Sequence, residues 1–232
     1  MACPASVRMA QGHQDQESEY AALGTEAHAA AAWCLEKGQD AWELVKRGDS
    51  AGEGYTLPYG DELFVDKEMA DAVQVYLDAV RLEHPPERWN QGNTWIEEPF
   101  HCSRVHPLMY GRVDFAYLDE DRRRLSVWDY KHGAGIVVEV PSNPQLMYYA
   151  VGMLTHRELW GLVDMVTLRI AQPRGFHHLG PVREWAVATK TLAHWRDEVL
   201  APAMRLADRV SRDASLSDDD LSRLNLLNSG EH

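Results

Sequence analysis

The chain has 232 residues, of which 45% are hydrophobic and 25% are charged, and its formal net charge is −13. This length suits one substantial domain or at most two small ones, and the composition is ordinary for a soluble globular protein. No apolar run approaches the roughly 18 residues that span a bilayer and no basic-then-apolar leader opens the sequence, so we expect a cytoplasmic protein without a membrane partner. Three scattered cysteines argue against a disulfide framework.

The net charge alone does not decide whether nucleic acid is a partner. An acidic balance opposes nucleic-acid binding at first sight, but a local basic groove can lie on an acidic body. Part of the acid lies in residues 213–232, which hold four aspartates and a glutamate beyond the last predicted helix. We expect this segment to be an acidic, flexible tail that follows a single domain over residues 1–212.

The first part of the domain, residues 1–90, is predicted to be helical. A short helix and a loop are expected over residues 1–22. The alanine-rich stretch GTEAHAAAAWCLEKG, residues 24–38, predicts a helix that ends at a glycine. A second helix is expected over residues 40–46. Apolar residues at helical spacing then predict a helix over residues 65–83, which ends before two prolines.

The catalytic core is predicted over residues 91–175, where the pattern changes to strands. Residues 93–100 read as a strand, and residues 111–118 and 124–131 as a β-hairpin. After a glycine-rich turn, Ser142, Asn143 and Pro144 form the start signal of a helix. Residues 163–173 predict a further strand. A long helix over residues 188–212, bent at Pro202, completes a mixed α/β core with helices on its flanks.

The predicted hairpin carries charges where it would be expected to be apolar. Pairing around a turn at residues 121 and 122 sets Leu118 opposite Leu125 and Asp114 opposite Asp129, with Lys131 two residues beyond. Opposed carboxylates repel, so two explanations compete. Either Lys131 and Arg112 neutralise the aspartates in an exposed salt-bridge cluster, or the carboxylates hold a divalent cation. The register is itself an inference, and a slip would place the carboxylates diagonally.

Four motifs in chain order favour the cation. The pattern G-x-x-D followed by D-x-K, here Gly111, Asp114, Asp129 and Lys131, resembles the core of the PD-(D/E)XK nuclease superfamily. The segment GTEAH upstream and the segment NPQLMYY downstream resemble the G-x-x-x-H and Q-x-x-x-Y motifs of its RecB-like branch. Further segments, including CPAS and IAQPRG, resemble a family of uncharacterised phage and prophage proteins placed in this superfamily.

The resemblance implies an α/β fold with a restriction-endonuclease-like core, in which a mixed sheet with a catalytic hairpin is flanked by helices. It also implies roles for particular residues. The metal ligands would be His28, Asp114, Asp129 and the backbone carbonyl of Tyr130. The catalytic residues would be Asp114, Asp129, Lys131 and Gln145. Lys131 would orient water or stabilise the transition state.

The remaining implied residues concern DNA. The family suggests that Tyr149, one helical turn after Gln145, contacts DNA, although a packed core aromatic is an alternative. Arg169 and Arg174, around the end of the later strand, are candidate phosphate contacts, although surface arginines often only face solvent. The expected cofactor is Mg²⁺ or Mn²⁺, since a histidine ligand suits manganese. No iron–sulfur cluster is expected, because no cysteine follows Cys102.

The expected function is a divalent-metal-dependent DNA nuclease in a bacterial host cell. An exonuclease acting in phage recombination or DNA end processing is favoured, with DNA as substrate and with a recombination partner protein and a homo-oligomer as further expectations. The alternatives are a non-cutting DNA-binding or assembly protein with the same fold, and a structure-specific endonuclease.

Overall fold

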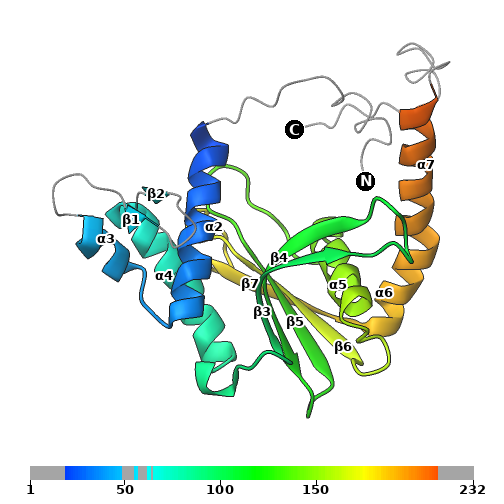
Figure 1. Ribbon diagram of the computed structural model, residues 1–232, viewed down its shortest axis with the longest axis horizontal. Helices are drawn as coiled ribbons and strands as arrows, with labels where there is room; N and C mark the ends of the chain where they lie inside the picture. Colours follow the sequence, from blue (N-terminus) through cyan, green and yellow to red (C-terminus); the bar gives the residue numbers. More distant parts are fainter. Residues whose placement is uncertain (1–18, 49–54, 57–61, 64, 214–232) are drawn as a thin grey trace.

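A five-stranded mixed β-sheet with helices on both sides forms the body of the protein (Figure 1). The computed structural model describes residues 19–48, 55–56, 62–63 and 65–213. The helix and loop predicted over residues 1–22 lie mostly outside this part, as does nearly all of the predicted acidic tail. The α/β class and the flanking helices are as predicted.

Helices dominate the first part of the chain, where they lie to one side of the sheet (Figure 1). Helix α2, Glu19–Lys37, ends at Gly38, whose φ of 63° places it in the left-handed region that favours glycine. Helix α4, Lys67–Glu83, begins at Asp66, whose side chain accepts a hydrogen bond from the Met69 amide at 2.7 Å. Shorter elements complete this part: α3 (Trp42–Gly48), β1 (Tyr55–Thr56), β2 (Glu62–Leu63) and η1 (Pro86–Arg88).

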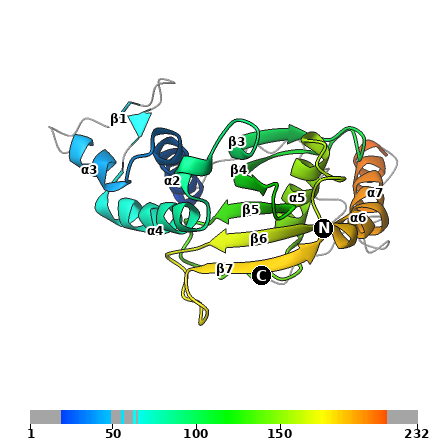
Figure 2. The same ribbon diagram turned by 90° about the horizontal axis from the view of Figure 1, so that it is seen from below.

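The large sheet has the strand order β3-β4-β5-β6-β7. Its strands are β3 (Thr94–His101), β4 (Tyr110–Asp119), β5 (Arg124–Tyr130), β6 (Met165–Ala171) and β7 (Val182–Ala188). Strands β5 and β6 pair in parallel, and the other neighbours pair antiparallel (Figure 2). Strand β7 was not predicted, so the sheet continues past residue 175, where the predicted core ended.

Three helices cover the other face of the sheet. Helix α5, Pro144–His156, connects β5 to β6, and the Asn143 side chain accepts hydrogen bonds from the amides of Gln145 and Leu146 at its start. The long helix predicted near the C-terminus is interrupted. Helix α6 (Thr189–Trp195) runs into a π-helical turn η2 (Arg196–Leu200) and then into α7 (Ala201–Arg212). The irregular turn therefore lies just before Pro202, where the bend was predicted.

Side chains that alternate along the strands build one apolar core on each face of the sheet. Leu118, Leu125 and Val127 pack with α5 and α7, whereas Phe115 and Trp128 pack with α2 and α4. The hairpin register is the predicted one, with Leu118 opposite Leu125. The same register, continued by one position beyond Phe115 and Trp128, brings Asp114 opposite Asp129.

Candidate metal centre

The charged end of the hairpin is held together by backbone and side-chain contacts. Asp114 accepts a hydrogen bond from the Tyr130 amide through Oδ2 at 2.6 Å, which fixes its carboxylate against β5. The Asp129 side chain is only 3% exposed, and Lys131 Nζ lies 3.0 Å from its Oδ2. Asp114 and Asp129 therefore lie at one end of the hairpin, inside the protein rather than on an open strand edge.

Asp129 is in an environment that disfavours its charge. Burial, and secondarily the charge of Asp114, raises the pKa of the Asp129 carboxyl, although Lys131 opposes this shift. Lys131 Nζ, at 3.0 Å, is the one partner that the described residues offer to Asp129 Oδ2, and this oxygen has almost no contact with solvent. A carboxylate oxygen can accept more than one interaction, so a bound cation would share it with Lys131.

Helix α2 brings His28 to the same end of the sheet. Its Nδ1 lies 3.4 Å from Asp114 Oδ1 and 3.8 Å from Glu97 Oε1. One ligand atom from each of these three residues can lie within 4.8 Å of the others, a spacing that suits a shared metal ion. Burial alone would lower the pKa of His28, but the two carboxylates outweigh burial and raise that pKa to about 10. A cation bound by His28 would have to displace this proton.

Glu97 was not among the predicted site residues. It lies on β3 directly opposite Asp114, since its neighbours Ile96 and Glu98 pair with Phe115 and Val113. Its φ of 47° is unusual for a residue with a side chain, and such strained positions cluster at functional sites. The only hint in the sequence is a pair of glutamates, Glu97 and Glu98, inside a strand that otherwise reads as apolar.

A chain of polar contacts extends the site toward α5. Lys131 Nζ donates to Gln145 Oε1 at 2.9 Å, and Gln145 Nε2 donates to the Tyr149 hydroxyl at 2.8 Å. Both α5 residues therefore face Lys131, as their spacing predicted. Tyr149 is half-buried, and burial is the main cause of its raised pKa. Its ring also contacts Phe100, so it has both a packing role and a place beside the site.

Tyr130 contributes its backbone to the site and its side chain to the core. The amide binds Asp114, while the ring stacks on Tyr76 and its hydroxyl contacts His132 Nδ1 at 2.9 Å. The proposed coordination by its backbone carbonyl stays a prediction.

The prediction that Arg169 contacts DNA is corrected by the structure. Its guanidinium is buried and lies over the Trp128 ring at 5.0 Å. It donates to Ser126 at 3.0 Å and forms ion pairs with Glu83 and Glu184 at 2.9 and 2.7 Å. A guanidinium with all of these partners and almost no exposed surface supports packing of the sheet against α4, not a phosphate contact.

Arg174 keeps some access to solvent. Its side chain is 24% exposed, forms an ion pair with Glu68 at 2.7 Å and donates to the His132 carbonyl. Because His132 directly follows Lys131, Arg174 contacts the backbone one residue beyond the site. Its contact with DNA stays a prediction.

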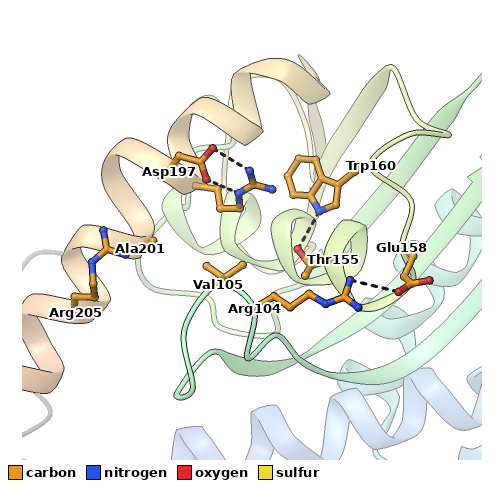
Figure 3. Close-up of a pocket in the computed structure, with 9 residues that line it drawn as sticks. Arg104, Val105, Thr155, Glu158, Trp160, Asp197, Ala201 and Arg205 are labelled. Atoms are coloured by element: carbon orange, nitrogen blue, oxygen red, sulfur yellow. Dashed lines mark hydrogen bonds and ion pairs between the residues drawn. The ribbon is translucent and has the colours of Figure 1, made fainter.

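A pocket of about 530 Å³ lies near the C-terminal end of α5 (Figure 3). Four of the five charged residues that line it form two ion pairs. Arg196 donates to both carboxylate oxygens of Asp197 and lies 4.5 Å from the Trp160 ring centroid, and Arg104 forms a 3.5 Å ion pair with Glu158. The pocket contains none of the predicted site residues, so it is not the candidate centre.

Together, the fold and this centre define an α/β protein with a histidine–carboxylate cluster at one end of its sheet. The nitrogen and oxygen ligands of this cluster suit a divalent cation such as Mg²⁺ or Mn²⁺. The chain belongs to a family described as a protein of unknown function (DUF2800), which matches residues 1–221. None of the helices in the described part of the chain is long and apolar enough to cross a membrane.

Proposed function

We propose that this protein is a divalent-metal-dependent DNA nuclease with a restriction-endonuclease-like core. The observation that carries the proposal is the convergence of His28, Asp114, Asp129, Lys131 and Gln145, from four separate sequence motifs, on one end of the sheet. An exonuclease in DNA end processing or phage recombination is the favoured form, by resemblance to the RecB-like branch.

The donor set fits Mg²⁺ or Mn²⁺. The carboxylates of Asp114, Asp129 and Glu97 supply oxygen ligands, and His28 supplies a nitrogen that manganese accepts. A metal bound there would polarise the phosphate and lower the pKa of a bound water. The burial of Asp129 supports this assignment, because a charged carboxylate that is only 3% exposed is costly, and a cation would offset that cost together with Lys131.

The contacts of Lys131 with Asp129 and Gln145 support its assignment as the group that acts on water and phosphate. In phosphodiester hydrolysis, the water oxygen bonds to phosphorus, the bond from phosphorus to the ester oxygen breaks, and the leaving oxygen takes up a proton. The ammonium group of Lys131 would hold the attacking water and stabilise negative charge on the phosphoryl oxygens. Gln145, through its 2.9 Å contact, holds Lys131 in place, and Tyr149 in turn holds the Gln145 amide.

Cleavage of end-labelled linear DNA in Mg²⁺, Mn²⁺ or EDTA tests the proposal. We expect metal-dependent loss of label, reduced at least about 100-fold by Asp129→Asn or Lys131→Met, as is typical when a group that stabilises transition-state charge is removed. Asp119→Asn is the matched control, because Asp119 lies at the other end of the same hairpin, beside Arg122.

Covalently closed circles and branched substrates separate the possible activities. An exonuclease degrades linear DNA and spares closed circles, whereas a structure-specific endonuclease cuts branched DNA without needing an end. If wild-type protein binds DNA but leaves linear, single-stranded, circular and branched substrates intact in both metals, cutting is refuted and a DNA-binding or assembly role replaces it.

A further inference from the structure

A small apolar pocket adjoins the candidate centre on its α5 side. It has a volume of about 250 Å³ and lies between the start of α5 and the junction of α6 with α7. Its walls include Pro144, Gln145, Tyr148, Trp195, Val199 and Ala203. Pockets that hold drug-sized ligands measure about 300–1,000 Å³, so this one suits a single flat ring system.

The pocket is joined to the centre through Gln145. The same amide that lines the pocket accepts from Lys131 Nζ at 2.9 Å, and Lys131 Nζ lies 3.0 Å from Asp129. A group in the pocket is thus separated from the buried carboxylate by two side chains. A ligand whose phosphate lies at the centre would place its next chemical group beside this pocket.

The π-helical turn η2 shapes the opposite wall. Trp195 directly precedes this turn, and Val199 lies within it with 48% of its surface exposed. π-Helical turns are rare and occur frequently at functional sites. An exposed valine beside a half-buried tryptophan leaves an apolar surface on the pocket wall that a flat ring would cover.

The polar groups of the α5 wall are already engaged elsewhere. The Gln145 amide bonds to Lys131 and Tyr149, and the Tyr148 hydroxyl donates to the Tyr110 carbonyl at 2.8 Å. These groups are therefore poorly placed to read the edge of a ligand by hydrogen bonding. What remains is a stacking and apolar surface, which accepts any nucleobase because every base has a π-face.

We infer that this pocket takes one unpaired nucleobase of the DNA strand whose phosphate lies at the metal centre. The inference rests on the proposed nuclease function and makes its substrate a single strand or a frayed end. A base inside a duplex is stacked and paired, so its faces are not available to the pocket. Binding is independent of base identity, for the reason given above.

Oligothymidylate carrying one 2-aminopurine at either end tests the inference, with full-length protein and with Ca²⁺ in place of Mg²⁺ or Mn²⁺, so that the oxygen ligands of the centre hold a cation while cleavage is suppressed. We expect wild-type protein to quench the analogue at one of the two ends. Ala203→Leu fills the pocket from α7 and should weaken binding about tenfold while restoring the emission, in line with the value of a base–aromatic stack. Val199→Gln, at an exposed position, should act in the same direction.

Val75→Leu on α4 is the matched control, because it enlarges an apolar side chain that is 37% exposed and does not line the pocket. The base pocket is overturned if Val199→Gln and a folded Ala203→Leu protein bind and quench like wild type. This outcome differs from failure of the proposed function. Metal-dependent cleavage with unchanged quenching refutes the pocket alone, whereas pocket-dependent quenching without cleavage on any substrate refutes the nuclease.

Discussion

Replacement of Gly152 by alanine should destabilise the protein, although alanine is the better helix former. Phe100, which is 2% exposed, lies between Gly111 of β4 and Gly152 of α5. A Cβ atom at Gly152 would lie 2.5 Å from Phe100 Cε2 and 2.6 Å from Cζ, well inside a carbon–carbon contact. The ring has little room to move toward β4, because it already fills the space beside Gly111. A Cβ built there would lie 2.7 Å from Phe100 Cζ.

The expected size of this effect follows from two opposing contributions. Alanine gains about 1 kcal/mol over glycine inside a helix, whereas overpacking a well-filled core costs about 1–3 kcal/mol. An overlap with three ring atoms belongs at the upper end of that range, so we expect Gly152→Ala to lower the free energy of unfolding by about 1–2 kcal/mol. Because α5 also carries Gln145, displacement of this helix should slow cleavage as well.

Urea denaturation followed by circular dichroism measures this change. Gly24→Ala in α2 is the control, because a Cβ there would meet no atom of the described residues within 4 Å outside its own stretch of helix, and alanine should stabilise the protein by about 0.5–1 kcal/mol. In a Phe100→Leu background, which removes the ring, the added cost of Gly152→Ala should shrink. If Gly152→Ala alone is as stable as wild type or more stable, the reasoning from steric overlap is refuted.

Three further predictions concern the metal, the pH dependence and a helix cap. Glu97→Gln should weaken the affinity for Mn²⁺, measured by calorimetry, at least about tenfold. Glu98→Gln should leave this affinity unchanged, because the Glu98 carboxylate pairs with Arg157. Equal affinities for the two variants would show that Glu97 is not a metal ligand. Burial, and then the charge of Arg169, lowers the pKa of His84 from 6.5 to about 3. The unfolded chain therefore binds more protons in this window, and stability falls as the pH drops below 6.5, by up to about 1.4 kcal/mol per pH unit from this group. His84→Phe should flatten the dependence between pH 7 and 5 in urea titrations, and an unaltered slope would contradict this assignment. Asn143→Ala removes the cap of α5 and should cost about 1 kcal/mol in the same assay, while Asn143→Asp should not.

Much of the fold could be predicted because its signals are local. Gly38 ends α2, Asn143 and Pro144 start α5, and the alternation along the hairpin gives its register. Strand β7 was missed because its sequence, VREWAVA, has a weak apolar pattern. It is an edge strand that pairs with β6 alone, and most of its side chains are at least partly exposed. The π-helical turn could not be predicted beyond the bend at Pro202, since its geometry depends on packing against the rest of the fold.

The residues of the candidate site also fall into those that local sequence signals predict and those that depend on distant contacts. Lys131, Gln145 and Tyr149 were predictable because motif spacing along one hairpin and one helix determines their approach. Glu97 was not, because its position depends on the pairing of β3 with β4 and on a left-handed backbone conformation. Arg169 was assigned to DNA because it lies near the end of a strand close to the centre, and its burial depends on the packing of α4 and β7, which supply Glu83 and Glu184.

The origin of His28 in the chain has a consequence for how the protein folds. Asp114, Asp129, Lys131, Gln145 and Tyr149 come from one continuous segment, which forms the hairpin and the helix after it. His28 comes from α2, and its contact with Asp114 closes a loop that contains α3, β1, β2, α4, η1 and β3. Closing a long loop costs more chain entropy than closing a hairpin turn, and contacts between distant segments slow folding. We therefore expect the carboxylates and the lysine to assemble first, and the histidine to join them when α2 docks.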